Sequence, residues 1–469
     1  MDFIGRIPPK ILSAICAALL SSAMAFSLYL KSEEMLICLI FAVTMFGLDI
    51  ILLGIVRTGK QTAVALTFAF LNTVGTALAV LNGISIIKLF VVIVTAVGLA
   101  ATAYRILPHI IRFIKQSKKR TVITLSVLAG MTFLLYMALL AFDKINGARA
   151  WYTIGGISIQ ATEITKLLFL CFIAVVFSSV YFGSVGKIIL SLAILGLNLF
   201  FLIIYNELGT AFVMVVSWTL IQFIFTKTRH GIVILTAVIL AFLLGIMVVN
   251  NLYVRFQDSG AENALVTAVN KVHSRLFPTD DYQTTMALQG IINGGFFGAG
   301  DYIVRIPVAE SDYAFASLAQ YFGIFTAILV IGGFIFILFC LQKNSEERLL
   351  FGFRFHLALV FIVCMIVQMT IVIFTNTKML PVIGICAPFI SSGGSQTVVS
   401  YIMVAVIASA VSTEKEVFKP FFTKRLKRKE IFNDELPDKD QTHLGRSDSC
   451  THHRNFFSGG KSRHFRRDR

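Results

Sequence analysis

The hydrophobic residues of this chain fall into long runs that are separated by short polar segments. The hydrocarbon core of a bilayer needs about 20 consecutive apolar residues for each spanning helix. By this criterion the pattern predicts about twelve spanning helices, and therefore an all-α, polytopic membrane bundle. Their expected ranges are 11–30, 35–56, 62–82, 86–104, 121–141, 164–182, 188–205, 209–226, 231–250, 313–341, 355–376 and 396–412.

Composition leads to the same fold class. Apolar residues make up 57% of the 469 positions and charged residues only 14%. A soluble domain of this size has too little interior to hide that much apolar surface. The net charge of +16 would suggest nucleic-acid binding in a soluble protein, but here loops and the C-terminal tail account for it, so no nucleic-acid partner is expected. The seven cysteines show no paired spacing for a metal or a disulfide.

Lysines and arginines in the connections set the orientation of the bundle. The largest cluster lies between residues 105 and 120, and Lys227, Arg348 and Arg354 fall on the same side. Because cytoplasmic loops carry the excess of positive charge, this side is expected to be cytoplasmic, together with both chain termini. The loops expected on the extracytoplasmic side are 142–163, 206–208, 251–312 and 377–395.

Charged residues at the outer ends of the helices are the first candidates for a functional site, because buried charge is costly in a bilayer. Arg149 lies in the loop before one such helix. Glu163 and Lys166 lie at the start of that helix and share one of its faces. An ordinary structural interpretation is also available for this pair. The acid favours the positive helix N-terminus, and the lysine extends to the headgroups.

Two further extracytoplasmic loops carry acids at helix starts. Glu207 lies in a very tight turn, where it is either a helix-starting acid or a ligand contact. The long loop 251–312 contains Gln283 and the glycine-rich stretch 294–300, and its length indicates a function. Asp312 ends this loop at the start of an apolar run, where it is either a helix cap or the acid best placed to act at the membrane surface.

The segment 376–390 contains Pro381, Gly384 and Pro388, which argue for a re-entrant or broken stretch. Membranes accommodate such a stretch only where it is buried in protein or lines a wet cavity. A small-residue loop then opens the last apolar run and offers backbone N–H groups and hydroxyls to an anion or a sugar. Its residues are Ser391, Ser392, Gly393, Gly394 and Ser395.

The order and spacing of these motifs resemble the SEDS family (shape, elongation, division and sporulation), which includes FtsW-type, RodA-type and spore-cortex polymerases. The resemblance covers roughly residues 121–412. The matching segments are Arg149–Trp151 with Gln160–Lys166, Glu207–Thr210, Tyr282–Gly300, Asp312–Ala316, Leu380–Gly384 and Pro388–Ser395. The last two segments are the most specific matches.

The resemblance implies a glycosyltransferase that polymerises lipid II into glycan strands at the outer face of the bacterial plasma membrane, for elongation, division or sporulation. It implies a class B penicillin-binding protein as partner, together with other division or elongation membrane proteins, and undecaprenyl pyrophosphate as the leaving product. The family's essential aspartate corresponds to Asp312, its Glu and Lys to Glu163 and Lys166, and its Pro-Phe-Ile-Ser serine to Ser391.

Several positions depart from the family pattern. The Gln-Pro-Ser of the family is Gln160–Thr162 here, its Glu-Glu pair after the aspartate is Gln320–Tyr321, and its Ser-Tyr-Gly-Gly is Ser391–Gly394. Two extra helices precede a family-like core of ten. The expected organisation is therefore an N-terminal helical part (1–120), a catalytic core (121–412) and a basic, disordered cytoplasmic tail (413–469).

The chemistry requires a base and an anion site. A sugar hydroxyl is a poor nucleophile, and a carboxylate acting as general base accelerates its attack by about 10²–10⁴-fold. Asp312 is the expected base, or the holder of an optional divalent cation such as Mg²⁺ or Mn²⁺. Expected contacts to the pyrophosphate and the sugars are Arg149, Glu163, Lys166, Glu207, Gln283, Lys378 and the residues 391–395.

Two other functions fit parts of the sequence. A flippase or transporter of a lipid-linked cell-wall precursor would also have many helices and broken segments, but it needs a polar site near the midplane. Only Lys88 and Asp49 come close to such a position. An inactive scaffold for a penicillin-binding protein fits the loss of the Glu-Glu pair, whereas the presence of Asp312 argues against it.

Overall fold

We analysed the protein in a computed structural model. The residues that the structure describes are 9–32, 35–55, 59–145, 147–154, 157–226, 228–259, 266, 269–270, 273, 282–300, 302–342, 352–381 and 383–411. Asp280, Asp281, the side chain of Asp49 and the predicted tail 413–469 lie outside this part of the chain.

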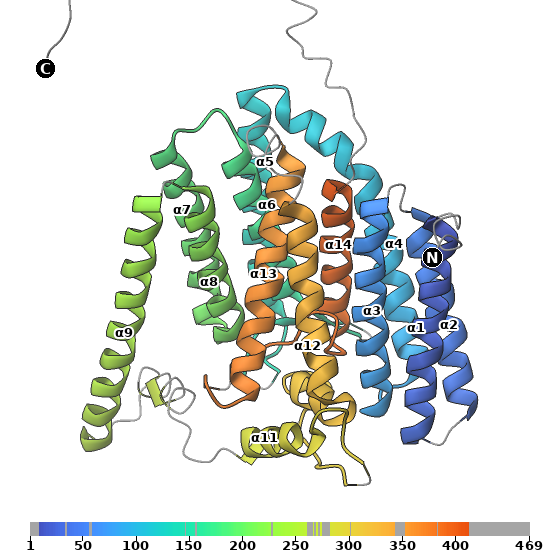
Figure 1. The fold of residues 1–469 in the computed structure, drawn as a ribbon. Helices are drawn as coiled ribbons and strands as arrows, with labels where there is room; N and C mark the ends of the chain where they lie inside the picture. Colours follow the sequence, from blue (N-terminus) through green and yellow to red (C-terminus); the bar gives the residue numbers. More distant parts are fainter. Residues whose placement is uncertain are drawn as a thin grey trace, which may run out of the picture. The chain divides into compact units, whose positions relative to one another are not determined.

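The polytopic helical fold is confirmed (Figure 1). The helices are α1 (Pro9–Ser32), α2 (Met35–Ile55), α3 (Gly59–Leu81), α4 (Ile86–Lys115), α5 (Lys118–Ala138), the 3₁₀ turn η2 (Leu139–Ala141), α6 (Ala161–Ser178), α7 (Ser184–Ile204), α8 (Leu208–Phe225), α9 (Thr228–Ser259), α11 (Tyr282–Gly294), α12 (Ala314–Gln342), α13 (Phe353–Asn376) and α14 (Gly394–Val411). Each of the twelve predicted spans coincides with one of these helices. Within the described residues, nine helices are long and apolar enough to cross a membrane.

Helix α13 lies at the centre of the bundle, where it packs against α6, α8, α12 and α14. Its sequence is apolar on every side, which is typical of a helix that is surrounded by protein. The start of α1 and the end of α14 lie at the same end of the bundle in Figure 1. This agrees with an even number of crossings from the start of α1 to the end of α14.

The predicted loops contain more regular structure than expected. A short antiparallel hairpin, β1 (Trp151–Ile154) and β2 (Ile157–Gln160), occupies the predicted loop 142–163. Helix α9 continues to Ser259, so the predicted loop start at residue 251 is wrong. Helix α11 forms within the same predicted loop, because Thr284, Ala287, Gly290 and Gly294 give it one face that it can bury.

Helix α12 is interrupted at Gly323, whose φ of 79° is left-handed. The break releases the N–H groups of Ile324 and Phe325, which donate to Gly295 O and Phe296 O at 3.0 and 3.1 Å. A side chain at residue 323 would collide with the backbone of residues 296–298. Glycine is therefore required for the glycine-rich loop to approach α12 this closely.

Candidate functional site

Four loops that are distant in sequence meet at one end of the bundle. They follow η2, α7, α11 and α13. The hydrogen bonds that join them are Arg149 N to Tyr205 O (2.9 Å), Gln160 N to Ser395 Oγ (2.9 Å), Ser391 Oγ to Ser311 O (2.7 Å) and Lys378 Nζ to Thr285 Oγ1 (3.4 Å). These contacts confirm that the four polar regions share one side of the membrane domain.

Backbone strain is concentrated in these loops. Among the described residues, four non-glycine residues have a left-handed φ, and they are Asn206 (66°), Val308 (53°), Lys378 (65°) and Phe389 (65°). Each such residue costs of order 1–3 kcal/mol and persists only where its surroundings determine it. The strain therefore identifies loops that are held in one particular arrangement.

Asp312 is half-buried at the end of a turn that precedes α12. Asn376, at the C-terminal end of α13, fixes this turn, because its Nδ2 donates to Asp312 O and its Oδ1 accepts from Ala316 N, both at 2.9 Å. Across from the carboxylate lies Gly384, with a φ of 66°. A Cβ at residue 384 would lie 3.5 Å from Asp312 Oδ2, so the re-entrant loop runs directly beside the acid.

The surroundings of Asp312 oppose its ionisation. Burial raises the pKa of its carboxyl group above the ordinary value, and the negative charge of Glu310 raises it further. Burial also raises the pKa of the neighbouring Cys386 thiol, and the charge of Asp312 raises this pKa further. The thiol therefore stays protonated at neutral pH, and Asp312 is the group of the two that can accept a proton.

The serines of the small-residue loop serve mainly to hold it in place. Ser391 Oγ accepts from Ala387 N at 2.7 Å while donating to Ser311 O. Ser392 donates to Glu310 O through both its N–H (2.9 Å) and its hydroxyl (2.8 Å). The predicted free donors at residues 391 and 392 are therefore occupied within the protein. Their effect is to attach the re-entrant loop to the turn that carries Asp312.

A buried ion pair lies beneath this loop. Lys166 and Glu163 are buried on α6, and Lys166 Nζ lies 2.7 Å from Glu163 Oε2. The same ammonium donates to Gln368 Oε1 of α13 at 2.9 Å, and Gln368 Nε2 donates to Cys386 O at 2.7 Å. Neither the headgroup position considered for Lys166 nor an open ligand position agrees with this burial. The pair supports the loop from below instead.

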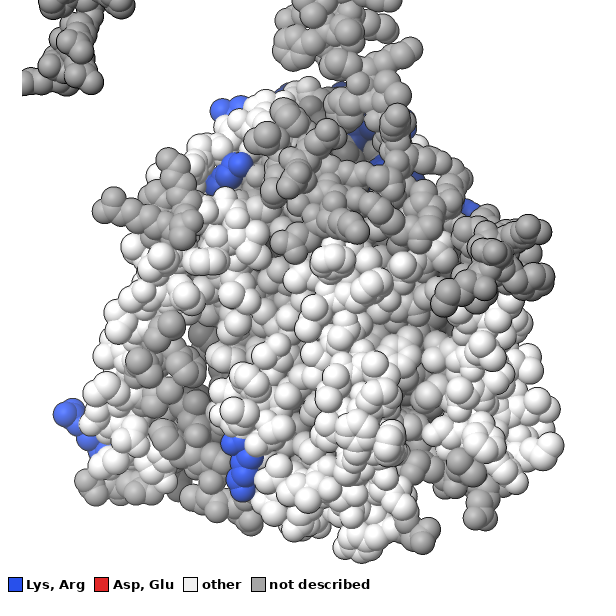
Figure 2. Space-filling model, in the orientation of Figure 1, with Lys and Arg blue, Asp and Glu red and all other residues white. Residues whose placement is uncertain are grey.

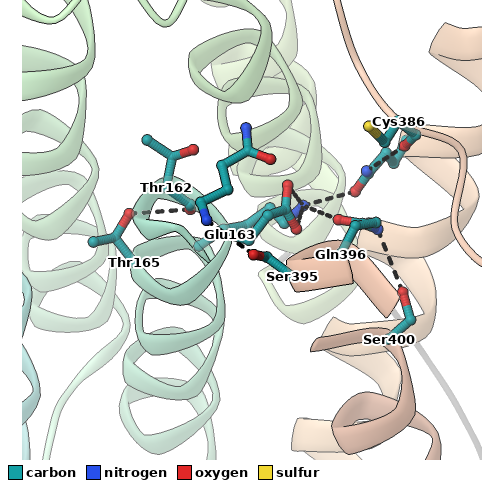
Figure 3. Close-up of polar contacts among 10 residues, drawn as sticks. Thr162, Glu163, Thr165, Cys386, Ser395, Gln396 and Ser400 are labelled. Carbon is teal, nitrogen blue, oxygen red and sulfur yellow. Dashed lines mark hydrogen bonds and ion pairs between the residues drawn. The ribbon is translucent and has the colours of Figure 1, made fainter. Parts of the chain in front are cut away.

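Helix α14 completes this network (Figure 3). Gln396 Oε1 accepts from Lys166 Nζ at 3.4 Å, and a half-turn of the amide places its nitrogen 3.0 Å from Glu163 Oε1. Ser395 Oγ accepts from Gln160 N at the end of β2. A charged pair is stable in a low-dielectric interior only when further hydrogen bonds satisfy it, and the two glutamines supply them.

Arg149 keeps unused donor capacity. Its backbone N–H is bound to Tyr205 O, but its Nε is buried and makes no hydrogen bond within the described residues. Burial raises the pKa of the Tyr205 hydroxyl, and the positive charge of Arg149 partly opposes this shift. Glu207 is buried at the start of α8 without capping that helix through its side chain. The guanidinium is thus a candidate ligand for an anion.

The remaining predicted residues lie around the outside of the site. Gln283 is exposed in the first turn of α11, and the exposed Lys378 reaches Thr285 of the same helix. Gly393 and Gly394 are half-buried where α14 begins. These positions are open to a ligand that approaches from the loop side.

A protein-held metal does not fit the donor set. Among the described residues, no three His, Cys, Asp or Glu side chains lie close enough together to hold a metal ion. Magnesium bound by one or two carboxylates takes its other ligands from water and substrate phosphates. The described side chains therefore do not form a metal site by themselves.

Sequence reasoning missed two amides that organise the site. Gln368 and Asn376 both lie in the predicted span 355–376, and both are buried in the structure. A polar side chain inside an apolar membrane run is itself a signal, because it must find a partner there. Gln368 is such a residue, and it links the ion pair to the re-entrant loop.

The chain matches a family model described as "Cell cycle protein", which is named for FtsW, RodA and SpoVE, over residues 62–416. The matched region begins in α3, so α1 and α2 precede it. A probable peptidoglycan glycosyltransferase FtsW from Alcanivorax borkumensis is 28% identical over 281 residues, which cover 57% of this chain and 69% of the relative. The peptidoglycan glycosyltransferase RodA of Mycobacterium bovis is 27% identical over 313 residues, which cover 60% of this chain and 62% of the relative.

A solved structure has the same fold. It is described as "Structural coordination of polymerization and crosslinking by a peptidoglycan synthase complex". Its matched chain superimposes with a TM-score of 0.54 and 20% identity, covering 73% of this chain and 96% of that chain. The similarity extends over most of the helical bundle, and at this identity it shows the fold alone.

Proposed function

The chain belongs to the FtsW/RodA/SpoVE family of cell cycle proteins, and from this premise we propose that it is a peptidoglycan glycosyltransferase that polymerises lipid II. Relatives from separate bacteria have "peptidoglycan glycosyltransferase" in their names. The observation that carries the proposal is the place of Asp312, a half-buried carboxylate beside a strained re-entrant loop. The names of these relatives favour a glycosyltransferase over a transporter.

Asp312 acts as general base in the proposed reaction. The hydroxyl oxygen of an acceptor sugar attacks the anomeric carbon of a lipid-linked donor, and its proton passes to the Asp312 carboxylate. The bond between that carbon and the pyrophosphate oxygen breaks, and prenyl pyrophosphate leaves with the electron pair. The raised pKa of Asp312 improves its strength as a base, because a base works best with a pKa near the operating pH.

The leaving pyrophosphate requires positive or N–H partners as its charge develops. Arg149 is the strongest candidate, because its buried Nε has no hydrogen-bond partner within the described residues. Lys378 and the backbone at Gly393 and Gly394 complete the proposed anion site from the opposite loop. Glu163 and Lys166 act indirectly in this proposal, by fixing the loop through Gln368.

An apolar cavity suits a lipid-linked substrate. It lies between α3, α4 and α14, and Phe389 of the re-entrant loop forms part of its wall. Phe68 and Tyr401 also line it, and their rings pack against the ring of Phe389. A lipid chain in this cavity would therefore contact Phe389, which belongs to the loop beside Asp312.

In the cell, the proposed reaction takes place at the outer face of the plasma membrane, in elongation, division or sporulation. The positive-inside rule supports this orientation, since the basic loops lie at the end of the bundle opposite Asp312. A class B penicillin-binding protein is the proposed partner, by analogy with the peptidoglycan synthase complex that shares the fold.

The test uses the purified full-length protein in liposomes with fluorescent lipid II. We expect glycan polymer from the wild type and at least a 100-fold lower rate from Asp312→Asn. Asp143→Asn is the matched control, because Asp143 is exposed on the same side of the bundle but outside the site. Transbilayer movement of lipid II without polymer would indicate a transporter, and neither polymer nor movement would indicate a scaffold.

A further inference from the structure

The C-terminal part of α4 extends beyond the membrane core. The helix has 30 residues and is therefore about 45 Å long, against about 30 Å of hydrocarbon. It starts on the side of the site, where Asn82 just before it binds Ala309 O and Ser317 Oγ. Its last turns follow Pro108, and Figure 1 shows this end of the helix leaning over the top of the bundle.

This end of α4 carries three separate stripes with the spacing i, i+4, i+7. The first stripe is buried against the protein and consists of Leu107, Ile111 and Ile114. The second is apolar and exposed, with Ile106, Ile110 and Phe113 each between 44% and 47% accessible. The third is exposed and basic, and it consists of Arg105, His109 and Arg112.

The order of the stripes matches the layers of a membrane surface. At 100° per residue, the exposed apolar stripe lies between the buried stripe and the basic stripe. A helix that is seated against the protein in this way turns its apolar stripe toward acyl chains and its cations toward headgroups. Arginine and lysine stems reach such positions by extending along the apolar surface.

The following turn adds more positive charge in a fixed arrangement. Ser117 caps α5 by accepting from Arg120 N at 3.3 Å, and Thr121 Oγ1 donates to Ile114 O at 3.1 Å. The Arg120 guanidinium carbon lies 5.1 Å from the centroid of the Phe113 ring, so this cation rests on the apolar stripe. Lys118 and Lys119 are exposed in the same helical turn.

These cations have no carboxylate partner within the described part of the chain, where the ion pair found is the buried Glu163–Lys166 pair. The surface in Figure 2 shows lysine and arginine side chains at this end of the bundle. These cations are therefore available to an anion from outside the described part of the chain. Because the basic stripe borders an apolar exposed stripe, an anion with an apolar tail would suit both stripes.

We propose that the α4–α5 corner, defined as residues 104–121, is a binding site for anionic phospholipid of the leaflet opposite the catalytic loops. The phosphodiester and headgroup of a lipid such as phosphatidylglycerol lie between Arg105, Arg112 and Arg120. Guanidinium groups form paired hydrogen bonds with phosphate oxygens, which makes arginine the suitable residue here. The acyl chains lie along Ile106 and Ile110. This site does not depend on the proposed catalytic function.

The test measures lipid retention by native mass spectrometry of the full-length protein, extracted from liposomes of equal phosphatidylcholine and phosphatidylglycerol. The wild type is expected to retain phosphatidylglycerol over phosphatidylcholine by at least 5-fold. The triple variant Arg105→Gln, Arg112→Gln, Arg120→Gln is expected to lose this preference. The triple lysine variant at the same positions keeps the charge and is expected to retain most of the preference.

A matched variant removes the same charge from the opposite side of the bundle through Lys144→Gln, Arg255→Gln and Arg305→Gln. It is expected to retain phosphatidylglycerol as the wild type does. Equal retention by the Arg105, Arg112 and Arg120 glutamine variant, with an unchanged melting temperature, would overturn the proposal. Displacement of the lipid by millimolar glycerol phosphate would also overturn it, because a site for a soluble phosphate needs no acyl chains.

Discussion

Two features of the fold change the pKa of the Asp312 carboxyl group. Burial and the charge of Glu310 both favour the protonated acid, so the pKa is raised. A general base must be deprotonated, and polymerisation should therefore fall as the pH drops through this raised value. Glu310→Gln removes one of the two causes. We expect the acid limb of the pH–rate profile to move to lower pH, measured as initial polymerisation rates between pH 4 and 8.

The control for this experiment is Asp143→Asn, whose acid limb should coincide with that of the wild type. Glu310 also holds the re-entrant loop, but it does so through its backbone carbonyl, which the substitution preserves. An unchanged or upward-shifted limb in Glu310→Gln would show that Asp312 is not the titrating base.

Gln368 joins the ion pair to the re-entrant loop through both ends of its amide. Gln368→Met fills a similar volume but removes both contacts, leaving a buried ammonium and a buried carbonyl with one partner fewer. We expect a loss of about 1–3 kcal/mol in stability and a lower kcat with little change in KM. Differential scanning fluorimetry and initial rates at varied lipid II concentration measure the two effects.

Gln368→Glu separates the two contacts of Gln368. A carboxylate still accepts from Lys166 but no longer donates to Cys386 O, so kcat should stay low if the loop contact is the important one. Thr370→Val is the control. Thr370 lies on the exposed side of the same helix, and its hydroxyl donates to the backbone carbonyl of Ile366 in that helix. A Gln368→Met variant with wild-type kcat would contradict the positioning role.

Among the helices, α3 shows how an element makes room for the site. A Cβ at Gly75 would collide with the carbonyl of Phe389, so glycine lets the re-entrant loop pack directly on the helix backbone. Gly75→Ala should displace that loop, lowering stability by about 1–3 kcal/mol and reducing polymerisation. Thermal unfolding and the lipid II assay measure both. Gly98→Ala is the control, because a Cβ there meets no atom within 4 Å.

The two alanine variants are expected to change the free energy of unfolding in opposite directions. Alanine in place of glycine inside a helix favours folding by up to about 1 kcal/mol when there is space for it. Gly98→Ala should therefore be neutral or slightly stabilising. If Gly75→Ala behaved like Gly98→Ala, close packing of the loop on α3 would not contribute to the fold.

For the whole molecule, apolar run length was enough to locate the helices, because spanning a bilayer constrains length and composition together. Successive spans cross the membrane in alternating directions, so the sequence also predicted which loops lie on the same side. The break at Gly323 could not be predicted, since it depends on hydrogen bonds from Ile324 and Phe325 to a separate loop at Gly295 and Phe296. The burial of Lys166 could not be predicted either, because its partner Gln368 is 202 residues away.

The orientation of the whole bundle in the membrane gives the last prediction. Met379 is 70% exposed beside the site, and Gln116 is exposed in the α4–α5 turn at the other end. By the positive-inside rule, the positive charge around Gln116 predicts a cytoplasmic position for that end. A membrane-impermeant maleimide should therefore label Met379→Cys in intact cells, and Gln116→Cys only after permeabilisation. The wild type gives the background from the native cysteines. Labelling of Gln116→Cys alone in intact cells would place Asp312 in the cytoplasm and contradict the proposed reaction.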